Sequence, residues 1–427
     1  MGLSRDKNNE EKQTKAPIVP TPIFDSYEQF RMLSFANPFS ETTPSIEHQI
    51  FELESQGVNC RDDYKYAVQF LLLHSRKSEQ TYNSFRTEVE RLLLWAWKIK
   101  KKTINELKRA DYEEYIDFCM NPPRVWVSSD RQVHFFEVQG ERQPNKNWKP
   151  FRVDGEQSSS RANIKRKPAQ ATLVKLFSTI SVFLDHLIME GYSENNPIPI
   201  VKKHSPYLIR DAHIREVHRL SELQWDFVLD TLMKKAEEDP RFERNLFALV
   251  MMKSCYLRVS ELAERDDWQP IMGHFQKKMG YVWISIFGKG RKLRSVSVPD
   301  EMIPFLIRYR KHRGLSEWPE ANEQEPLIHK LKGQGGPSIR QITRLIEDSF
   351  EISINKMIED GFRDDAIELK EATSHWLRHT GASMDVKTRP LKHLADDLGH
   401  ASLSTTDRIY VQSDDLERAE SGRKRKV

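Results

Sequence analysis

Four short patterns in the second half of the chain contain residues that could bind or attack a phosphate. The first is CYLRVSEL, residues 255–262, in which Arg258 follows a long apolar helix and Ser260 with Glu261 can start the next helix. An arginine held between two helix ends can direct its planar guanidinium at a phosphate. Taken alone, Arg258 is explained more simply as a structural arginine paired with Glu261.

The second pattern is GKGRK, residues 288–292, at the tip of an expected hairpin. Glycines allow the backbone to approach a polyanion closely, and Lys289 and Lys292 supply positive charge. The pattern lacks the GxxxxGK[ST] spacing of a nucleotide-binding P-loop. A basic hairpin tip on its own is typical of a solvated surface.

The third pattern is SHWLRHTGA, residues 374–382. On a helix, His375 and Arg378 lie three residues apart and share one face. His375 and His379 have a spacing that zinc ligands use, but the HExxH motif needs Glu where this chain has Trp376. We therefore expect no metal here, and a packing or supporting role for His379.

The fourth pattern is LGHASLSTTDRIYV, residues 398–411. Gly399 ends a helix, His400 follows, and Tyr410 lies ten residues later in a segment that Ser404 or Thr405 can cap. By itself such a tyrosine is most simply a half-buried packing residue.

The elements that must position these residues are predicted to be mainly helical. Apolar residues recur at spacings of three and four over Thr81–Trp97 and Ala171–Glu190, and Ser221 can cap a further helix. Residues 281–287 and 295–298 are instead rich in aromatic and β-branched residues, which predicts a hairpin around the basic turn. The expected class is mainly α with a small β-hairpin or sheet (α+β).

Composition limits the possible settings. The chain has 427 residues, 38% apolar and 30% charged, which suits two or three packed domains. No apolar run approaches the roughly 20 residues of a membrane span, and no secretory signal is recognisable. The three cysteines form no CxxC motif, which argues against a disulfide scaffold or a thiolate zinc site and favours a reducing cytoplasm.

The distribution of charge is more informative than the net charge of +4. Residues 140–220 contain 14 Lys and Arg against 8 Asp and Glu, and the chain ends in SGRKRKV. Basic segments of this kind suit a phosphate backbone. A solvated surface explains the charge counts alone just as simply.

Together and in this order, the four patterns resemble the catalytic domain of the tyrosine recombinase (phage integrase) family. The resemblance is carried by LRVSEL, FGKGRK, HWLRHTGAS and LGHASLSTT, and it covers residues 215–415 strongly and residues 60–200 more weakly. It implies a catalytic set of Arg258, Lys289, His375, Arg378, His400 and Tyr410. Lys292 is the alternative to Lys289, and the His-to-Tyr spacing of ten is one more than the family often has.

The chemistry that the resemblance implies is transesterification of DNA without a cofactor or a metal ion. Tyr410 attacks the scissile phosphorus, forms a 3′-phosphotyrosine and expels a 5′-hydroxyl. Arg258 and Arg378 hold the non-bridging oxygens, and Lys289 protonates the leaving oxygen. His375 assists proton removal from Tyr410 or supports the phosphate oxygens, and His400 hydrogen-bonds the phosphate.

The resemblance also implies a domain order and a set of partners. We expect a partly disordered N-terminal extension over 1–58, a helical core-binding domain over 59–200, a linker over 201–220, the catalytic domain over 221–415 and a basic tail over 416–427. The two domains would form a C-shaped clamp on double-stranded DNA. The expected DNA-binding residues are Lys165, Arg166, Lys167, Lys202, Lys203, Arg291 and Lys292.

The expected function is site-specific recombination, as integration or excision of a mobile element, in a prokaryotic cytoplasm at the nucleoid. The active form would be a homo-tetramer on paired recombination sites, helped by a DNA-bending or directionality factor and without contact to a membrane. A type IB topoisomerase shares the active-site logic, and a non-catalytic DNA-binding accessory protein could share the fold. A metal-dependent nuclease fits least well, because the chain shows no clustered carboxylate or His/Cys motif.

Overall fold

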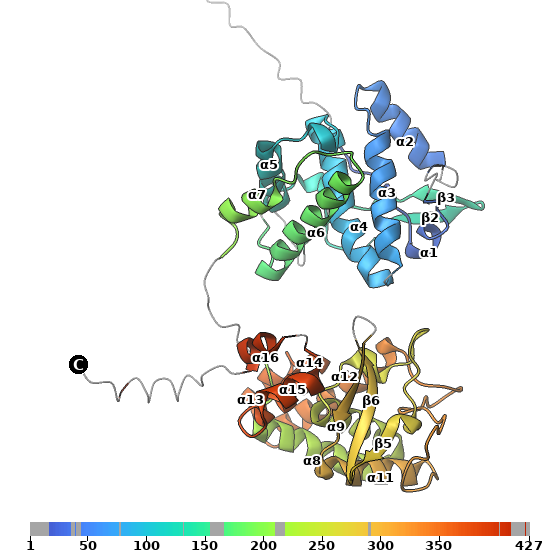
Figure 1. Ribbon diagram of the computed structural model, residues 1–427, viewed down its shortest axis with the longest axis vertical. Coiled ribbons are helices and arrows are strands. Elements are labelled where there is room, and N and C mark those ends of the chain that lie inside the picture. Colours follow the sequence, from blue (N-terminus) through green and yellow to red (C-terminus); the bar gives the residue numbers. More distant parts are fainter. Residues whose placement is uncertain are drawn as a thin grey trace, which may run out of the picture. The chain divides into compact units, whose positions relative to one another are not determined.

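The computed structural model (Figure 1) describes residues 17–35, 39, 44–76, 78–130, 132–153, 166–209, 218–288, 292–400, 402–410 and 423. The chain divides into two compact units, unit 1 over Met1–Asp211 and unit 2 over Ala212–Val427. Each unit has its own hydrophobic core.

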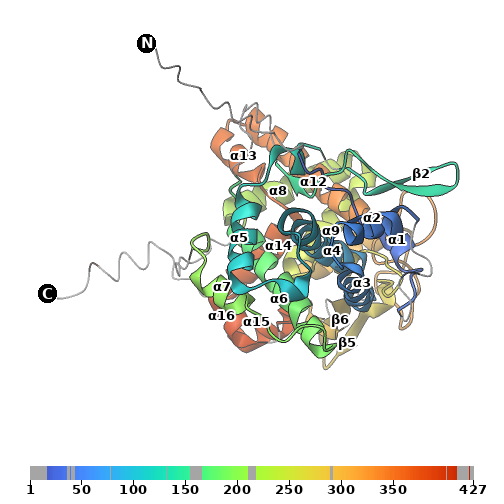
Figure 2. The same cartoon turned by 90° about the horizontal axis from the view of Figure 1, so that it is seen from above.

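Unit 1 is built around three long helices that lie side by side, α3, α4 and α6 (Figures 1 and 2). Ser78 caps α4 by accepting a hydrogen bond from the backbone of Thr81 at 3.1 Å, and the helix continues beyond its end as a short π-helix over Ala96–Lys100. The helices of this unit are α1 (Tyr27–Phe30), α2 (Pro44–Ser55), α3 (Arg61–Ser75), α4 (Glu79–Trp95), α5 (Arg109–Met120), α6 (Gln170–Met189) and α7 (Ile198–His204).

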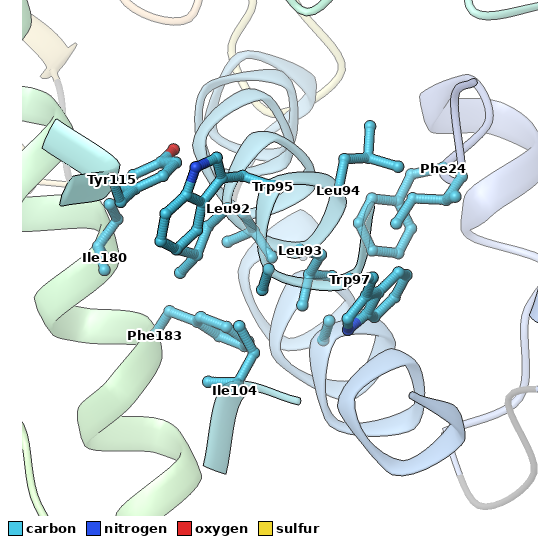
Figure 3. Packing of buried hydrophobic residues seen from close by; sticks show 14 of the residues in the cluster. Phe24, Leu92, Leu93, Leu94, Trp95, Trp97, Ile104, Tyr115, Ile180 and Phe183 are labelled. Carbon is cyan, nitrogen blue, oxygen red and sulfur yellow. The ribbon is translucent and has the colours of Figure 1, made fainter. Parts of the chain in front are cut away.

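The apolar face of α4 forms the centre of the core of unit 1. Figure 3 shows Trp95 against Tyr115 of α5, with Phe183 of α6 below them. Phe24, from the segment before α1, is buried in the same core, where its ring stacks on that of Tyr64 of α3. The described part of the expected N-terminal extension is therefore integral to unit 1.

A polar segment between α5 and α6 adds four short strands to unit 1. β1 (Val127–Ser128) pairs in parallel with β4 (Phe151–Arg152), and β2 (Phe135–Val138) forms a hairpin with β3 (Glu141–Pro144). Arg142 of this hairpin donates two hydrogen bonds to the carboxylate of Asp25, at 2.5 and 2.8 Å. The ion pair ties the inserted hairpin to the segment before α1.

Two features of unit 1 differ from simple sequence expectations. The expected linker over 201–220 begins inside α7, because Pro197 and Pro199 stand at the start of this helix, where no backbone donor is needed. By length and composition α6 could cross a membrane, but half of its most apolar window is buried, with Phe177, Ile180 and Phe183 in the core. Such burial is what a core helix shows.

Unit 2 places a helical cluster against a three-stranded antiparallel sheet of order β5-β6-β7. The predicted hairpin is present as β6 (Tyr281–Gly288) and β7 (Lys292–Ser297), with Phe287 opposite Leu293, and β5 (Phe275–Lys278) is an additional strand. The helices are α8 (Glu222–Glu238), α9 (Glu243–Ser254), α10 (Val259–Leu262), α11 (Ile303–His312), α12 (Ile339–Glu359), α13 (Arg363–Leu369), α14 (Ser374–Asp385), α15 (Leu391–Leu398) and α16 (Leu403–Tyr410).

Packing in unit 2 brings the end of α9 against α14, α14 against α15, and α15 against α16 (Figure 1). Gly381 permits the contact between α9 and α14, because a Cβ atom at this position would lie 2.0 Å from the carbonyl oxygen of Lys253. The observed class, mainly helical with small sheets, confirms the sequence prediction.

Candidate active site

Arg258 occupies the N-cap of α10, directly after the turn that ends α9. Tyr256 has φ of +52° in this turn, and the backbone N–H of Arg258 donates to the carboxylate of Glu261 at 2.8 Å. The guanidinium of Arg258 also donates to Glu261, at 3.0 Å, and remains partly exposed. The pairing expected for a structural arginine is thus present, and it leaves part of the guanidinium accessible.

Glu261 is fully buried and holds a second arginine, Arg294 of β7. The two terminal nitrogens of Arg294 donate to the two carboxylate oxygens at 2.7 and 2.9 Å. Burial opposes ionisation of Glu261, but the hydrogen bonds and charge of Arg294 outweigh it and hold the pKa of this carboxyl below its usual range. Space for Arg294 exists because positions 288 and 399 are glycine, where a Cβ would come within 2.9 Å of the arginine.

Arg378 of α14 is the most deeply buried cation of the site, with 1% of its surface exposed. Its guanidinium donates to the carbonyl oxygens of Tyr256 and Leu398, at 2.5 and 2.6 Å. Burial, followed by repulsion from Arg258, lowers its pKa to about 10. Backbone carbonyls fix the orientation of this guanidinium without neutralising its charge.

His400 lies directly after α15 and contacts Arg378. A terminal nitrogen of Arg378 is 3.4 Å from Nε2 of His400, and the other ring nitrogen is 2.8 Å from the hydroxyl of Thr406. Burial, and then the charge of Arg378, lower the pKa of His400 to about 4. A neutral ring accepts from Arg378 at Nε2 and donates to Thr406 at Nδ1.

Tyr410 ends α16 with only 5% of its surface exposed, and its ring lies parallel to that of His400, with centroids 6.3 Å apart. Burial raises the pKa of the phenol, and the charge of Arg378 partly offsets this effect. The phenol oxygen lies 2.8 Å from Nδ1 of His379. His375, one turn earlier on α14, is exposed and packs against the ring of His379 at a centroid distance of 4.6 Å.

The structure thus gathers five of the six predicted catalytic residues in unit 2: Arg258, His375, Arg378, His400 and Tyr410. Among the described residues, the guanidiniums of Arg258, Arg294 and Arg378 have only the carboxylate of Glu261 as an ion-pair partner. The site therefore has an excess of positive charge beside a phenol. This arrangement can hold a phosphate and present an oxygen nucleophile to it.

Several predicted residues lie elsewhere. Lys289, Arg291 and Lys165 fall outside the described residues, and Lys292, the alternative hairpin lysine, is exposed at the start of β7. The other predicted DNA contacts belong to unit 1. Lys167 and Lys203 are exposed, Lys202 is partly buried on α7, and Arg166 donates to the carbonyl oxygen of Cys119 at 2.9 Å.

Sequence reasoning missed two supporting residues of the site, Glu261 and Arg294. Glu261 was considered only as a partner that would make Arg258 structural, Arg294 was not considered, and His379 was expected to pack or support. Gly288 and Gly399 were the available signal, since both stand in the quoted patterns and both make room for Arg294.

In the part of the chain that is described, no group of three His, Cys, Asp or Glu side chains could hold a metal ion.

Residues 226–417 match the Phage integrase family, and this segment contains every residue of the assembled site. The chain thus contains a domain that matches this family. It is 22% identical over 357 residues to a tyrosine recombinase of Thermosipho africanus, covering 83% of this chain and 96% of that protein. It is 27% identical over 251 residues to tyrosine recombinase XerC of Thermodesulfovibrio yellowstonii, covering 58% and 72% of the two chains.

A solved structure has the same fold as this chain. The XerH site-specific recombinase, in a post-cleavage complex with a palindromic difH substrate, superposes with a TM-score of 0.50 at 18% identity. The match covers 83% of this chain and 88% of that one. The superposition covers more of this chain than residues 226–417, so unit 1 also shares its fold with that protein.

Proposed function

We propose that this tyrosine recombinase cuts and rejoins DNA at specific sites through a 3′-phosphotyrosine intermediate. The observation that carries the proposal is the position of Tyr410, whose ring lies parallel to that of His400 with centroids 6.3 Å apart, while His400 is itself 3.4 Å from a guanidinium nitrogen of Arg378. The phenol oxygen attacks the scissile phosphorus and the 5′-oxygen leaves, so one phosphodiester replaces another and no external energy source is required.

Each site residue has a role in this proposal. Arg258 and Arg378 stabilise the extra negative charge that develops on the non-bridging oxygens, and this is the largest expected contribution. His400 completes the oxygen contacts, His375 supports them, and Lys289 protonates the leaving 5′-oxygen. Two guanidiniums provide the charge that metal ions provide in other phosphoryl-transfer sites, so we propose that cleavage needs no metal.

Unit 1 is proposed to hold the DNA. It has a groove of about 1070 Å³ whose lining includes Arg86, Lys149, Arg152, Arg166 and Lys175. Basic side chains along a groove suit contacts to successive phosphates, which position DNA without reading its sequence. Lys165, Lys167, Lys202, Lys203, Arg291 and Lys292 are proposed as further contacts, and the two units as a clamp around the duplex.

The biological setting is part of the same proposal. The chain would act in the cytoplasm as a homo-tetramer on two recombination sites and integrate or excise a mobile element, with an accessory DNA-bending or directionality factor. The insert between α5 and α6 and the segment before α3 exceed what a minimal pair of domains needs, which favours a mobile element. Analytical ultracentrifugation with and without cleaved DNA tests the tetramer.

The decisive experiment traps the covalent intermediate. The protein is incubated with a pool of nicked duplexes of random core sequence, in which cleavage beside the nick releases a short fragment and prevents rejoining. We expect a protein–DNA adduct that survives denaturation, persists in EDTA and is lost in Tyr410→Phe. Sequencing the trapped ends identifies the target, and an adduct formed equally well by Tyr410→Phe would contradict the proposal.

A topoisomerase would also form an adduct, so a second assay separates the two functions. Site-specific recombination predicts exchange between two copies of the trapped sequence. Relaxation of supercoiled DNA that lacks this sequence would instead indicate a type IB topoisomerase. Binding to the site without any adduct would indicate an accessory protein.

A further inference from the structure

The Tyr410 hydroxyl forms a hydrogen bond with a histidine outside the expected catalytic set. Nδ1 of His379 is 2.8 Å from the phenol oxygen, and the two ring centroids are 5.5 Å apart. His375, the residue expected to assist proton removal, is exposed and has its ring against that of His379. Of the two histidines on α14, His379 is therefore the one in direct contact with the nucleophile.

The direction of this hydrogen bond follows from the charges around it. His379 is partly buried, and burial followed by repulsion from His375, Arg378, His400 and His218 lowers its pKa to about 4. Burial also keeps the phenol of Tyr410 protonated, because it raises the pKa of that group. The phenol O–H therefore donates, Nδ1 of His379 accepts, and the ring proton of the neutral imidazole is on Nε2.

We propose that His379 takes the proton of Tyr410 when the phenol oxygen attacks DNA. The inference rests on the proposed recombinase function. In the forward step the bond from the phenol oxygen to phosphorus forms, the phenol O–H bond breaks and its proton moves to Nδ1. The bond from phosphorus to the 5′-oxygen breaks, and that oxygen is protonated from the opposite side of the site. In the rejoining step His379 returns the proton to the departing phenol.

The same surroundings explain why the free protein does not ionise its own nucleophile. The groups that act most strongly on His379 are His375 and Arg378 on α14, His400 after α15 and His218, and its hydrogen-bond partner is Tyr410 on α16; none of these is a carboxylate. Proton transfer would place an imidazolium among these groups. A phosphodiester bound to Arg378 and Arg258 adds the missing negative charge, so basicity at His379 rises when the substrate is in place.

A matched pair of variants tests the proposal. Asparagine places an amide oxygen near the position of Nδ1, so His379→Asn keeps an acceptor for the phenol but cannot take a proton; His375→Asn is the control. The rate of adduct formation is measured on the trapped nicked duplex across pH. A second duplex carries sulfur in place of the leaving 5′-oxygen, and its thiolate needs no proton to depart.

We expect His379→Asn to cleave about 10²- to 10⁴-fold more slowly than the native protein, the usual range for a lost general base. Its rate should recover as pH rises toward the pKa of the phenol, and the sulfur leaving group should not restore it. His375→Asn should lose less activity and keep the pH profile of the native protein. Native rates in His379→Asn, or rescue by the sulfur leaving group, would overturn the proposal.

A measurement on the native protein covers the case in which His379→Asn fails to fold. The ¹⁵N shifts of His379 should show a neutral ring with Nδ1 unprotonated near pH 7, and the apparent pKa of the ring should rise when a duplex is added to Tyr410→Phe. A proton on Nδ1 near pH 7, or no rise with DNA, would refute the role. Absence of any adduct from the native protein on the random pool would instead overturn the recombinase function, and this inference with it.

Discussion

Glu261 and Arg294 form a two-point ion pair, with nitrogen–oxygen distances of 2.7 and 2.9 Å, and the same carboxylate accepts a hydrogen bond from Arg258. One fully buried carboxylate thus orients the partly exposed guanidinium of Arg258 and the more buried guanidinium of Arg294. The orientation of Arg258 therefore depends on Glu261, three residues later, and on Arg294 of β7, 36 residues later.

Removing the charge of Glu261 should therefore destabilise unit 2. Glu261→Gln leaves two guanidiniums without a counter-ion, and breaking a buried pair by removing one partner usually costs about 3–5 kcal/mol. Urea unfolding should show this loss. Asp230→Ala removes one partner of the exposed Lys234–Asp230 pair and should change stability by less than about 0.5 kcal/mol. Equal effects of the two substitutions would contradict the assigned role of Glu261.

Arg378 should not tolerate lysine. Its two terminal nitrogens bond the carbonyl oxygens of Tyr256 and Leu398, and a single ammonium cannot reproduce this fork. We expect Arg378→Lys to reduce adduct formation at least about 10²-fold. DNA affinity in a gel-shift assay should change much less. Arg340→Lys, at an exposed position of α12, is the control and should cleave at the native rate.

Gly381 should not accept a methyl group. A Cβ atom at this position would lie 2.0 Å from the carbonyl oxygen of Lys253, so α14 would have to move away from α9 and carry Arg378 with it. Gly381→Ala should cost at least about 3 kcal/mol of unfolding free energy, at the upper end for overpacking, and lower the cleavage rate as well. Asn355→Ala, on the exposed face of α12, should be nearly neutral in both assays.

The half-buried histidines His379 and His400 should make the stability of unit 2 depend on pH. The pKa values of His379 and His400 lie at about 4, lowered first by burial and then by neighbouring cationic groups, against an ordinary value of 6.5. Between about pH 4 and pH 6.5, the unfolded chain therefore binds more protons at these histidines than the folded protein does. The resulting stability is fully present above pH 6.5 and is lost as pH falls toward 4.

Urea unfolding at about pH 7.5 and about pH 5.5 measures this dependence. The doubly substituted His379→Asn, His400→Asn protein should lose less stability between the two conditions than the native protein. His393→Asn, at an exposed position of α15, is the matched control. An unchanged difference in the double variant would show that other groups set the pH dependence.

The sequence predicts structural features that depend on neighbouring residues better than features that depend on residues far apart in the chain. Local periodicity predicted α4, α6 and the β6–β7 hairpin, and Ser221 accepts the expected capping bond from Gln224 at 3.1 Å. The linker was expected over 201–220, but residues 201–204 belong to α7, whose prolines stand only at positions that a helix tolerates. Composition alone cannot separate these two outcomes.

The site residues that belong to a sequence motif could be predicted, whereas the contacts that arise from tertiary packing could not. The order of Arg258, His375, Arg378, His400 and Tyr410 pointed to one pocket, and unit 2 assembles them. The link from Glu261 to Arg294 depends on how β7 packs beside α10, which no local pattern encodes. The contact between His379 and Tyr410 joins residues 31 positions apart on two helices, and depends equally on the tertiary fold.

The unneutralised guanidinium of Arg378 has a thermodynamic consequence for the whole of unit 2. Its burial between carbonyl oxygens costs free energy that a carboxylate could have offset, so an anion that binds this guanidinium should stabilise the native state. Folding and anion capture are consequently linked, and a phosphodiester at 100 times its dissociation constant would add about 2.7 kcal/mol to the stability of the native state. The DNA-free enzyme is then the less heat-resistant form, and its melting temperature reports how fully its pocket is occupied.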